Sequence, residues 1–454
     1  MIKINTDKIE EAVYNLCISA NTIYDNNLYQ KLFEKYETET DKKAQSKLKN
    51  ILDNIELAKK RNRPLCQDTG QVIVFIEIGQ SVVLDGINLN VAINKAIREA
   101  YENNYYRKSV VKNAIFDRTN TSTNTPAIIY TEIIDKPEIN IKVLIKGAGS
   151  ENYSTTKMLT PAANSNDIYE FIKQSVITAG EKSCPPLVLG IGIGGTMDTA
   201  AVLSKKAFFN EVNTKEEEKF IKGLRTYLKD INKNILDIKI MTTSTHIASL
   251  PCALTINCHS TRHSSCTITE KGITYKIQNT EYKKTLQNDF KAIKIHTDEK
   301  EKIKNLKKGQ IILLNGKIYT ARDAAHKKIV DYYKKYKKLP FDVNGKIIFY
   351  AGPCPAAPDE VLGPIGPTTS TRMDSYCELL YSKGLLATIG KGERTENANK
   401  FIKQYKGKYF CAQGGIACLL ANCIKESKVI AFEELGTESV RELTVENFPL
   451  EVYI

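Results

Sequence analysis

The spacing of apolar residues predicts helices first and then a sheet. Over residues 6–63, apolar positions recur every three or four residues, which indicates amphipathic helices that each bury one face. Asp7 and Glu10 stand where a capping box would begin the first of these helices. Pro64 ends the pattern, and the unbroken apolar run at residues 72–76 predicts a buried strand. A further helix is expected at about 91–101, and strands at about 127–134 and 139–145.

Strands and helices keep alternating through the rest of the chain. An apolar run at 187–189 leads into glycines and then a helix near Thr196, whereas the polar, lysine-rich residues 271–301 suggest a connection between domains. Asn315 and Gly316 are expected to form a turn. The other expected elements are a helix at about 214–229 and strands at about 235–241, 310–314, 346–350, 385–389 and 429–432. We therefore predict an α/β protein with two domains, a mixed α/β domain at residues 1–287 and a β/α domain at residues 288–454.

The composition indicates an ordered protein with more than one core. A chain of 454 residues is longer than one hydrophobic core usually supports, and 42% hydrophobic with 26% charged residues is ordinary for a folded protein. No stretch is long and apolar enough to span a bilayer, and the first residues lack the apolar centre of a signal peptide. We therefore expect a cytoplasmic protein with no membrane partner.

The net charge of +13 is compatible with binding to nucleic acid, because clustered Lys and Arg neutralise phosphates. Here the lysines are spread along the chain and acidic residues are interleaved with them, so solvated helix faces explain the charge better. We expect no nucleic-acid partner and keep a basic, zinc-containing nucleic-acid-binding protein as a remote alternative. A cationic surface would also draw a small dianionic acid toward a cleft.

The eleven cysteines are expected to be buried hydrophobes, ligands or nucleophiles, because disulfides are rare in a reducing compartment. Cys66, Cys184 and Cys258 adjoin turn-forming or polar residues, whereas Cys418 and Cys423 lie beside apolar, helix-like sequence, as does Cys411. No Cys-x-x-Cys pair occurs, so the spacing of the cysteines does not by itself indicate zinc or a ferredoxin cluster. Judged by spacing alone, cysteines with unrelated roles are a better interpretation than a shared metal site.

Two glycine-rich segments have different predicted uses. Residues 146–152, which include Gly149, form a turn that can point several backbone N–H groups at an oxyanion. Residues 190–195 follow an apolar run, but no ribose-binding acid follows on a next strand, which argues against a dinucleotide fold. Their glycines either let the backbone approach a bulky inorganic group beside Cys184 or form a tight strand-to-helix turn.

Six motifs together carry a resemblance to a known family. The first half contains Cys66-Gln-Asp-Thr-Gly, Cys184-Pro-Pro with Gly190–Gly195, and Asn257-Cys258-His-Ser-Thr-Arg-His263. The second half contains Tyr319-Thr-Ala-Arg322-Asp, Gly366-Pro-Thr-Thr-Ser-Thr-Arg372 and Ile389-Gly-Lys-Gly392. In this order they resemble the class I fumarase and tartrate dehydratase family of iron–sulfur hydro-lyases, with α- and β-subunit-like parts fused. The resemblance covers nearly the whole chain and implies a swivelling-type C-terminal domain and a homodimer.

The resemblance implies a [4Fe–4S] cluster held by Cys66, Cys184 and Cys258, all within the N-terminal domain, with one iron open to substrate. An open iron is a Lewis acid that could bind a carboxylate and the hydroxyl of a small dicarboxylic acid. Substrate-binding roles are implied for Gln67, Arg107, Gly149, Arg322, Thr369, Arg372 and Lys391. Guanidinium groups suit this role because their fork matches a carboxylate.

For proton transfer, the resemblance implies Thr368, aided by Asp68 and His246. A threonine hydroxyl alone is far too weak a base, so it needs a relay to a carboxylate or an imidazole. His263 and His326 could orient ligands or substrate, but a structural role is at least as good an interpretation of either.

The implied reaction is the reversible hydration of fumarate to (S)-malate, a step of central metabolism. Dehydration of L-tartrate to oxaloacetate is the alternative in the same class, because tartrate dehydratases share the architecture. The chain is shorter than the long fused fumarases and ends at Ile454, and Cys258 is followed by His259 and Ser260, where the long forms have small residues. It is thus similar to a fused version of the two-subunit enzymes.

Overall fold

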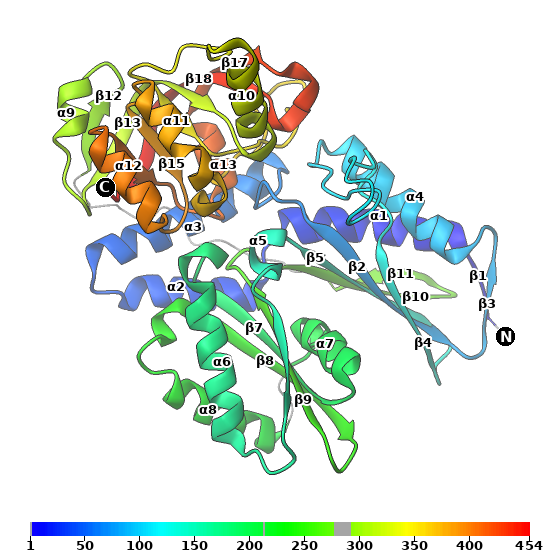
Figure 1. The fold of residues 1–454 in the computed structure, drawn as a ribbon. Coiled ribbons are helices and arrows are strands. Elements are labelled where there is room, and N and C mark those ends of the chain that lie inside the picture. The colour runs from blue at the N-terminus through cyan, green and yellow to red at the C-terminus, as the bar shows by residue number, and fades with distance from the viewer. Residues whose placement is uncertain (1, 212–213, 277–291) are drawn as a thin grey trace. The chain divides into compact units, whose positions relative to one another are not determined.

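The structure, a computed structural model, describes residues 2–211, 214–276 and 292–454. Its chain forms two compact units, unit 1 with residues 1–35 and 68–282 and unit 2 with residues 36–67 and 283–454. Both units mix helices with strands, as predicted (Figure 1). The predicted domain boundary at residues 287 and 288 lies outside the described residues and stays a prediction. No helix in the described ranges has the length and apolar character needed to cross a bilayer.

Unit 1 contains a five-stranded sheet in the order β11-β10-β5-β2-β4. Helices α1 (Thr6–Thr22) and α4 (Leu89–Asn103) pack together and against this sheet, and their apolar faces share one core with its strands (Figure 1). The strands are β2 (Gln71–Gly79), β4 (Ile128–Ile134), β5 (Ile139–Lys146), β10 (Arg262–Thr269) and β11 (Gly272–Tyr275). A parallel pair, β1 (Ile2–Asn5) with β3 (Val82–Asp85), completes this part.

The start of α1 differs from the prediction. Asn5 caps the helix, since its side chain accepts the N–H of Asp7 at 2.8 Å, so the predicted capping box of Asp7 and Glu10 was wrong. An Asn at this position satisfies a backbone donor that the helix leaves without a partner.

A second sheet of unit 1 has the order β6-β9-β7-β8. Helices α6 (Ser165–Ala179) and α8 (Lys215–Tyr227) share a core with it, and α7 (Met197–Lys206) packs against β7 and β9. Its strands are β6 (Thr155–Leu159), β7 (Leu187–Gly195), β8 (Ile235–Thr245) and β9 (Leu250–Asn257). The short helix α5 (Ala148–Glu151) follows β5.

The glycines of β7 are explained by packing and by a turn. A Cβ on Gly190 would lie 2.1 Å from the Ser204 carbonyl oxygen, so the strand touches α7 backbone to backbone. Gly192 meets α7 in the same way, while Gly194 and Gly195 have positive φ values of 102° and 67° at the turn before the helix. The turn that the sequence suggested is present, and close helix packing is a reason that the sequence did not reveal.

Unit 2 is built on a seven-stranded sheet in which five strands close on themselves. Strands β13 to β16 are parallel neighbours, and the long strand β18 pairs antiparallel with both β16 and β13. The strands are β12 (Ile293–His296), β13 (Ile311–Thr320), β14 (Ile347–Phe349), β15 (Ala387–Gly390), β16 (Lys408–Cys411), β17 (Ile424–Ala431) and β18 (Val440–Val452). The helices are α9 (Lys300–Lys304), α10 (Asp323–Tyr336), α11 (Cys377–Ser382), α12 (Glu396–Gln404) and α13 (Ala417–Asn422).

Several features of the C-terminal half differ from the prediction, and one of them is β16, a strand that was not predicted and that ends at Cys411, which was expected beside helix-like sequence. The turn at Asn315 and Gly316 was wrong, because β13 runs through it with a register shift against β18, and Gly316 takes φ 103° there. Strands β11 and β12 lie in the segment 271–301 that looked like a connection, and β18 was not predicted at all.

Helix α3 (Lys42–Arg61) belongs to unit 2, although the sequence places it early in the chain. Its buried face packs against α13, and Lys47 forms an ion pair of 3.0 Å with Glu451 of β18. Asn54 is buried, and its side chain bonds the segments around Leu65 and Cys418. The loop that carries Cys66 therefore begins from a helix held in unit 2.

Candidate active site

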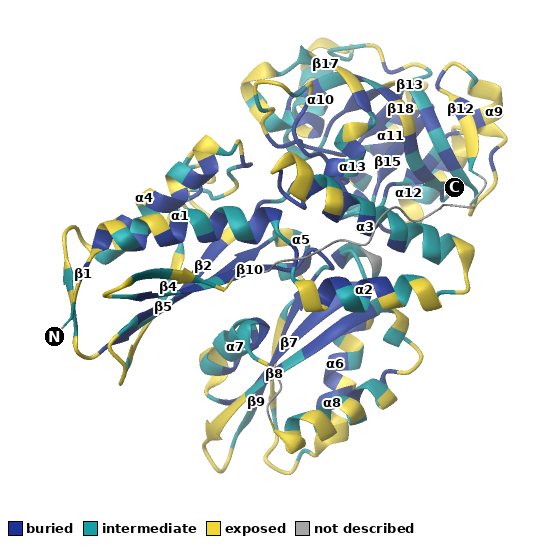
Figure 2. Cartoon of the chain, turned by 180° about the vertical axis from the view of Figure 1, so that it is seen from behind, coloured by how far each residue is buried: buried dark blue, intermediate teal, exposed yellow. Residues whose placement is uncertain are grey.

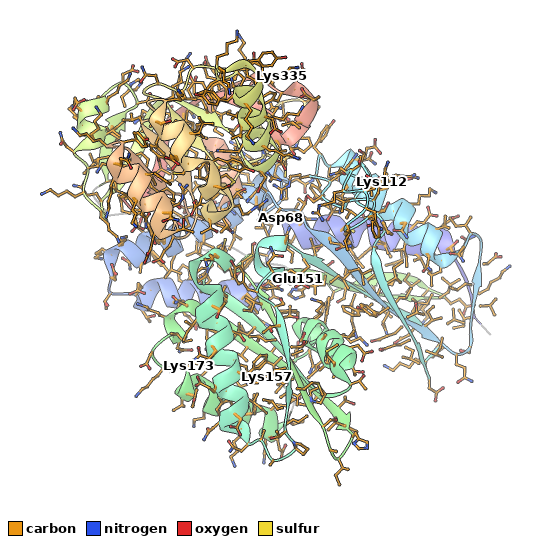
Figure 3. All side chains as sticks on the ribbon, viewed as in Figure 1. Asp68, Lys112, Glu151, Lys157, Lys173 and Lys335 are labelled. Carbon is orange, nitrogen blue, oxygen red and sulfur yellow. The ribbon has the colours of Figure 1, made fainter. Side chains whose placement is uncertain are left out.

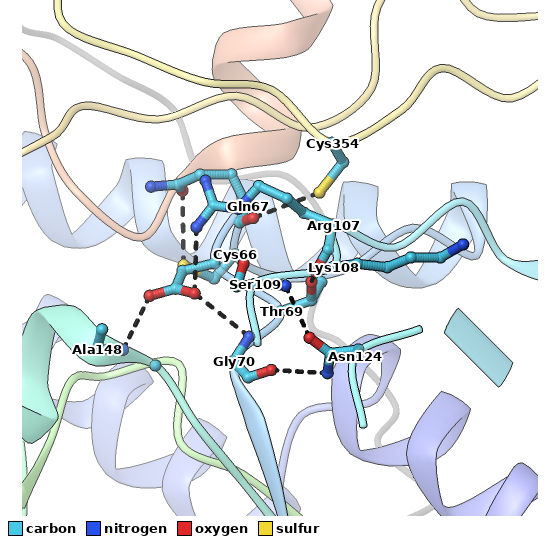
Figure 4. A network of polar contacts seen from close by, with 12 residues as sticks. Cys66, Gln67, Thr69, Gly70, Arg107, Lys108, Ser109, Asn124, Ala148 and Cys354 are labelled. Atoms are coloured by element: carbon cyan, nitrogen blue, oxygen red, sulfur yellow. Dashed lines mark hydrogen bonds and ion pairs between the residues drawn. The ribbon is translucent and has the colours of Figure 1, made fainter. Parts of the chain in front are cut away.

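Asp68 is the centre of the polar network of unit 1 (Figure 4). Its carboxylate accepts the N–H of Ala148 at 2.9 Å and that of Gly70 at 3.3 Å, and it pairs with Arg107 at 3.1 Å. Arg262 donates to the Asp68 carbonyl oxygen at 2.6 Å. The start of β2, the Arg107 loop, the glycine turn and the Cys258 motif are thus joined at one residue.

The electrostatics of this network keep Asp68 ionised. Burial alone would raise the pKa of its carboxyl, but Arg107, Arg262 and the two backbone N–H groups together hold that pKa below its ordinary value. A carboxylate stabilised in this way is a weak base and a good orienting acceptor. Gly149 lies in the turn that binds it, one residue after Ala148.

The structure brings two of the three predicted cluster ligands together in unit 1. The backbone N–H of His259 lies 3.4 Å from the carbonyl oxygen of Cys184, and its Nδ1 lies 3.0 Å from the same oxygen. Cys184 stands just before β7 and Cys258 just after β9, two paired strands whose register matches Val188 with Asn257. Both cysteines are half-buried, and the Cys258 sulfur lies 3.0 Å from the Ser260 hydroxyl.

The other cysteines of unit 1 are buried. Burial raises the pKa of the Cys17, Cys252 and Cys266 thiols to about 12, so they are poor sources of thiolate. The half-buried pair therefore fits a thiolate-bound group better than any of these. No three His, Cys, Asp or Glu side chains in the described part of the chain are grouped as a metal site, and Cys66 belongs to unit 2.

Unit 2 holds Cys66 and Gln67 against the loop that carries Thr368. A Cβ on Gly366 would lie 2.3 Å from Gln67 Oε1, so this loop lies directly on the Gln67 amide, and a larger residue at 366 would have to displace that side chain. Cys354 donates to the Gln67 carbonyl oxygen at 3.4 Å (Figure 4). The Cys66 sulfur lies 3.5 Å from Gln67 Oε1, so the predicted ligand and the predicted substrate-binding amide are neighbours.

Backbone hydrogen bonds bring three predicted residues of unit 2 together. The N–H of Lys391 donates to the Thr368 carbonyl oxygen at 3.1 Å, and Thr369 and Lys391 form a parallel bridge. Thr368 is buried and its own N–H donates to the Tyr350 carbonyl oxygen at 2.7 Å. The loop after β14 and the end of β15 therefore present these groups side by side.

The two predicted arginines of unit 2 are each paired with an acidic residue. Arg372 is exposed and makes a two-pronged pair with Asp323, with Nε to Oδ1 at 2.8 Å. Arg322 pairs with Glu438, which also accepts the N–H of Ala324 at 2.9 Å. Burial would raise the pKa of Glu438, but Arg322 and Arg372 hold it below the ordinary value, so both guanidinium forks are held in place by carboxylates.

The structure does not bring Asp68 and His246 together within one chain. His246 is exposed in the connection between β8 and β9, next to Ile247, which is 90% exposed (Figure 2). The whole of β9, 8 residues and roughly 26 Å at about 3.3 Å per residue, separates His246 from Cys258. Asp68 lies at the Cys258 end, where it binds Arg262.

The two other histidines that the sequence singled out, His263 and His326, have structural surroundings. His326 is buried between Tyr350 and Tyr376, and burial lowers its pKa to about 4, so it is neutral. His263 packs edge-on against Phe209, and its Nε2 lies 3.7 Å from Asp25. Burial lowers the pKa of His263 as well, so of the two interpretations the structure favours the structural one for both residues.

Sequence reasoning missed three residues of these networks. Arg262 lies inside the Cys258 motif, and its type and position were a usable signal. Glu438 is 116 residues from Arg322 in the chain, and no local pattern marks it. Lys146 opens the glycine turn and is buried, which its position at the end of an apolar strand could have indicated.

Comparison with known proteins first defines the class. Residues 10–267 match the family described as fumarate hydratase (Fumerase), and residues 267–454 match the family described as fumarase C-terminus. These are hydro-lyases. The chain therefore belongs to the fumarate hydratase family, and the resemblance carried by its motifs is confirmed.

Individual relatives cover most of the chain. The anaerobic class I fumarate hydratase of Escherichia coli is 29% identical over 440 residues, which are 88% of this chain and 79% of that protein. A putative class I fumarate hydratase of Geobacillus stearothermophilus is 26% identical over 97% of this chain and 93% of its own. A putative L(+)-tartrate dehydratase subunit alpha of Methanocaldococcus jannaschii is 34% identical over 275 residues, 57% of this chain and 96% of its own.

Proposed function

We propose that this protein is an iron–sulfur hydro-lyase that catalyses the reversible hydration of fumarate to (S)-malate. The observation that carries the proposal is the joining of Cys184 and Cys258 by His259, beside the Asp68 and Arg107 pair. Relatives named class I fumarate hydratase, similar over 88–97% of the chain, support the choice of substrate.

Cys66, Cys184 and Cys258 would hold a [4Fe–4S] cluster with one iron open to substrate. When bound, the cluster supplies a Lewis acid at the hydroxyl and a carboxylate of the substrate. The thiol chemistry supports this set, because the burial that raises the pKa of Cys252 and Cys266 to about 12 disfavours them as ligands.

The residues of the chain would bind and orient a small dicarboxylic acid. Arg107, Arg322, Arg372 and Lys391 supply positive charge, and Gln67, Gly149 and Thr369 supply neutral hydrogen-bonding groups. Because Asp323 and Glu438 already hold two of the guanidinium groups, substrate would meet preoriented forks rather than flexible side chains.

For proton transfer we propose Thr368, with Asp68 and His246 as the relay. Since the connection between β8 and β9 places His246 a whole strand away from Cys258 and Asp68 of its own chain, we propose that the pair forms between the two copies of a homodimer.

We also propose separate roles for the two domains predicted from the sequence. Residues 1–287 would be the iron–sulfur domain, and residues 288–454 a swivelling-type domain that closes over substrate. The closed ring of strands in unit 2 supports independent folding of such a domain. A cytoplasmic location and a place in central metabolism are part of the same proposal.

Dehydration of L-tartrate to oxaloacetate is the second candidate, and the 34% identity to a putative L(+)-tartrate dehydratase subunit alpha favours it. Activity on fumarate, malate and tartrate should be compared with anaerobically purified, reconstituted protein. We expect turnover of fumarate and malate to dominate; dominant tartrate turnover would replace the proposal with the second candidate.

The cluster itself is tested by Cys258→Ser, which should abolish activity and brown colour, while Cys252→Ser, on the strand β9 that precedes Cys258, should keep both. Full activity of Cys258→Ser with an intact cluster would exclude this ligand. A wild-type protein that stays colourless after reconstitution with iron and sulfide, and binds DNA with steep salt dependence, would favour the zinc-containing alternative.

A further inference from the structure

Lys146 is a buried lysine at the junction of the two unit-1 sheets. It ends β5, its side chain is 3% exposed, and its ammonium donates to the Ile256 carbonyl oxygen at 2.6 Å and to the Ser150 hydroxyl at 2.8 Å. Ile256 belongs to β9 and stands two residues before Cys258. A lysine is rarely buried unless an anion compensates its charge.

Among the described residues, the ion pairs around Lys146 hold more positive than negative charge. Glu151 lies 3.4 Å from the Lys146 ammonium, but the same carboxylate also pairs with Lys205 at 2.6 Å. Two ammonium groups thus share one carboxylate, which leaves one excess positive charge in a buried place. Glu151 lies in the same turn whose Ala148 binds Asp68, and Figure 3 labels both acids.

The end of β9 brings Cys258 toward this excess positive charge, because Cys258 stands two residues after Ile256, whose carbonyl oxygen binds the Lys146 ammonium. Burial lowers the pKa of Lys146 to about 8, Glu151 raises it, Lys205 lowers it further, and the negative charge of a Cys258 thiolate raises it again. The ammonium is also tied by Ile256 to the strand that ends beside this cysteine. Position and charge therefore both direct the excess positive charge to Cys258.

We propose that Lys146 is a positioning residue that supplies the buried counter-charge for the anionic thiolate-bound cluster at Cys258. The inference rests on the proposed iron–sulfur function. Lys146 would stabilise the ligated cysteine electrostatically and fix the end of β9, and would touch neither substrate nor the reacting atoms. Removal of its charge should make the cluster harder to reduce and easier to lose.

The experiment compares Lys146→Met, Lys146→Arg and the matched control Lys205→Met, which removes the other ammonium on Glu151. Iron and sulfide per chain, the rate of iron loss to a chelator and the reduction midpoint potential by EPR-monitored titration are measured on anaerobically reconstituted full-length protein. Lys146→Met should lose iron several-fold faster and have a more negative midpoint potential. Lys146→Arg and Lys205→Met should stay near the wild type in both.

Folding is controlled with the cluster-free proteins. Lys146→Met leaves the Ile256 carbonyl oxygen and the Ser150 hydroxyl without this donor, so its cluster-free form should melt at a lower temperature than the wild type. Iron loss is therefore measured well below the melting temperature of every cluster-free variant, where a loss of iron does not reflect unfolding. If Lys146→Met keeps the wild-type potential and iron-loss rate, or if Lys146→Arg behaves like Lys146→Met, the inference is overturned. A wild-type chain that takes up no cluster overturns the proposed function and this inference together.

Discussion

At the scale of single residues, Arg262 connects the motif around Cys258, in which it lies, to Asp68. The guanidinium is buried and bonds the Asp68 carbonyl oxygen at 2.6 Å and Asn21 Oδ1 of α1 at 3.2 Å. It also lowers the pKa of Asp68. Four residues after Cys258, it makes the geometry of the Asp68 loop depend on the geometry of the cysteine loop.

Arg262→Gln should therefore change both stability and the pH profile. Loss of a buried charge that bonds two elements should lower the free energy of unfolding by about 3 kcal/mol. Because a positive charge near Asp68 disappears, the pKa of Asp68 should rise, so any acid limb of the activity profile that Asp68 controls should move to higher pH. Denaturant unfolding and pH–rate profiles measure the two effects.

Arg262→Lys and Arg225→Gln are the controls for this prediction. Lys keeps the charge at Arg262 but not the planar fork, so the pH profile should move less than in Arg262→Gln. Arg225 is on α8, away from Asp68, and its loss should leave the pH profile unchanged. An unchanged profile in Arg262→Gln, with normal folding, would show that Asp68 does not depend on this guanidinium.

The sequence predicts the individual site residues only where motif and chemistry coincide. Cys184 and Cys258 could be selected from the polar or turn-forming residues beside them, and their approach follows from the pairing of β7 with β9. Glu438 could not be selected, because its role depends on a contact with Arg322 across 116 residues. Side-chain pairs of this kind follow from tertiary packing, which periodicity does not encode.

At the scale of elements, α3 is the one whose placement matters most for the site. Asn54 on its buried face accepts the N–H of Cys418 at 2.9 Å and donates to the carbonyl oxygens of Leu65 at 3.0 Å and Gly415 at 3.3 Å. One side chain thus satisfies the start of α13 and the residue before Cys66. Within unit 2, helix α3 therefore packs against α13 and also fixes the loop that carries Cys66.

Asn54→Ala should destabilise the protein by about 2–4 kcal/mol, because several buried backbone groups lose their partners. The cluster content should fall with it, since the Cys66 loop loses its anchor. Asn50→Ala is the matched control, one turn earlier on the same helix, where a half-buried side chain bonds only Gln413 among the contacts seen, at 3.2 Å. Thermal unfolding with iron analysis tests this, and equal behaviour of the two variants would contradict the anchoring role.

Element prediction succeeded where one period dominates. The apolar runs of β2 and β5 and the amphipathic faces of α1 and α3 were identified from the sequence, because burial on one side imposes that pattern. It failed at Gly316, where a bulge within a continuous strand resembles a turn, and at β18, whose polar positions alternate around a proline. Both strands pair with each other across more than a hundred residues, and periodicity does not encode that contact.

At the scale of the whole molecule, two units each hold part of the predicted site. Unit 1 has Asp68, Arg107, Gly149, Cys184 and Cys258, and unit 2 has Cys66, Gln67, Arg322, Thr368, Thr369, Arg372 and Lys391. His246 also belongs to unit 1, but it is separated from the other site residues of that unit because it precedes β9 whereas Cys258 follows β9. The sequence could not reveal this, because His246 stands only twelve positions before Cys258, and nothing in the sequence shows that the whole of β9 lies extended between them.

If His246 serves the site of a second copy, two inactive variants should complement each other. Asp68→Asn and His246→Asn should each be nearly inactive alone. In a mixed dimer, the His246 of the first variant meets the Asp68 of the second, so one site is intact and the other lacks both groups. Random mixing by co-expression or by refolding should thus restore about one quarter of the wild-type activity per dimer, because half of the dimers are mixed and each has one good site.

The control for this experiment pairs two residues that contact each other within one chain. Asp68 and Arg107 form an ion pair of 3.1 Å inside unit 1, so a mixture of Asp68→Asn and Arg107→Ala should restore nothing, since every site then lacks one of the two. Restoration in the first mixture and not in the second requires a site shared between copies. If neither mixture regains activity although mixed dimers are shown to form, His246 does not reach a partner's Asp68, and the relay must be built from other groups around Thr368.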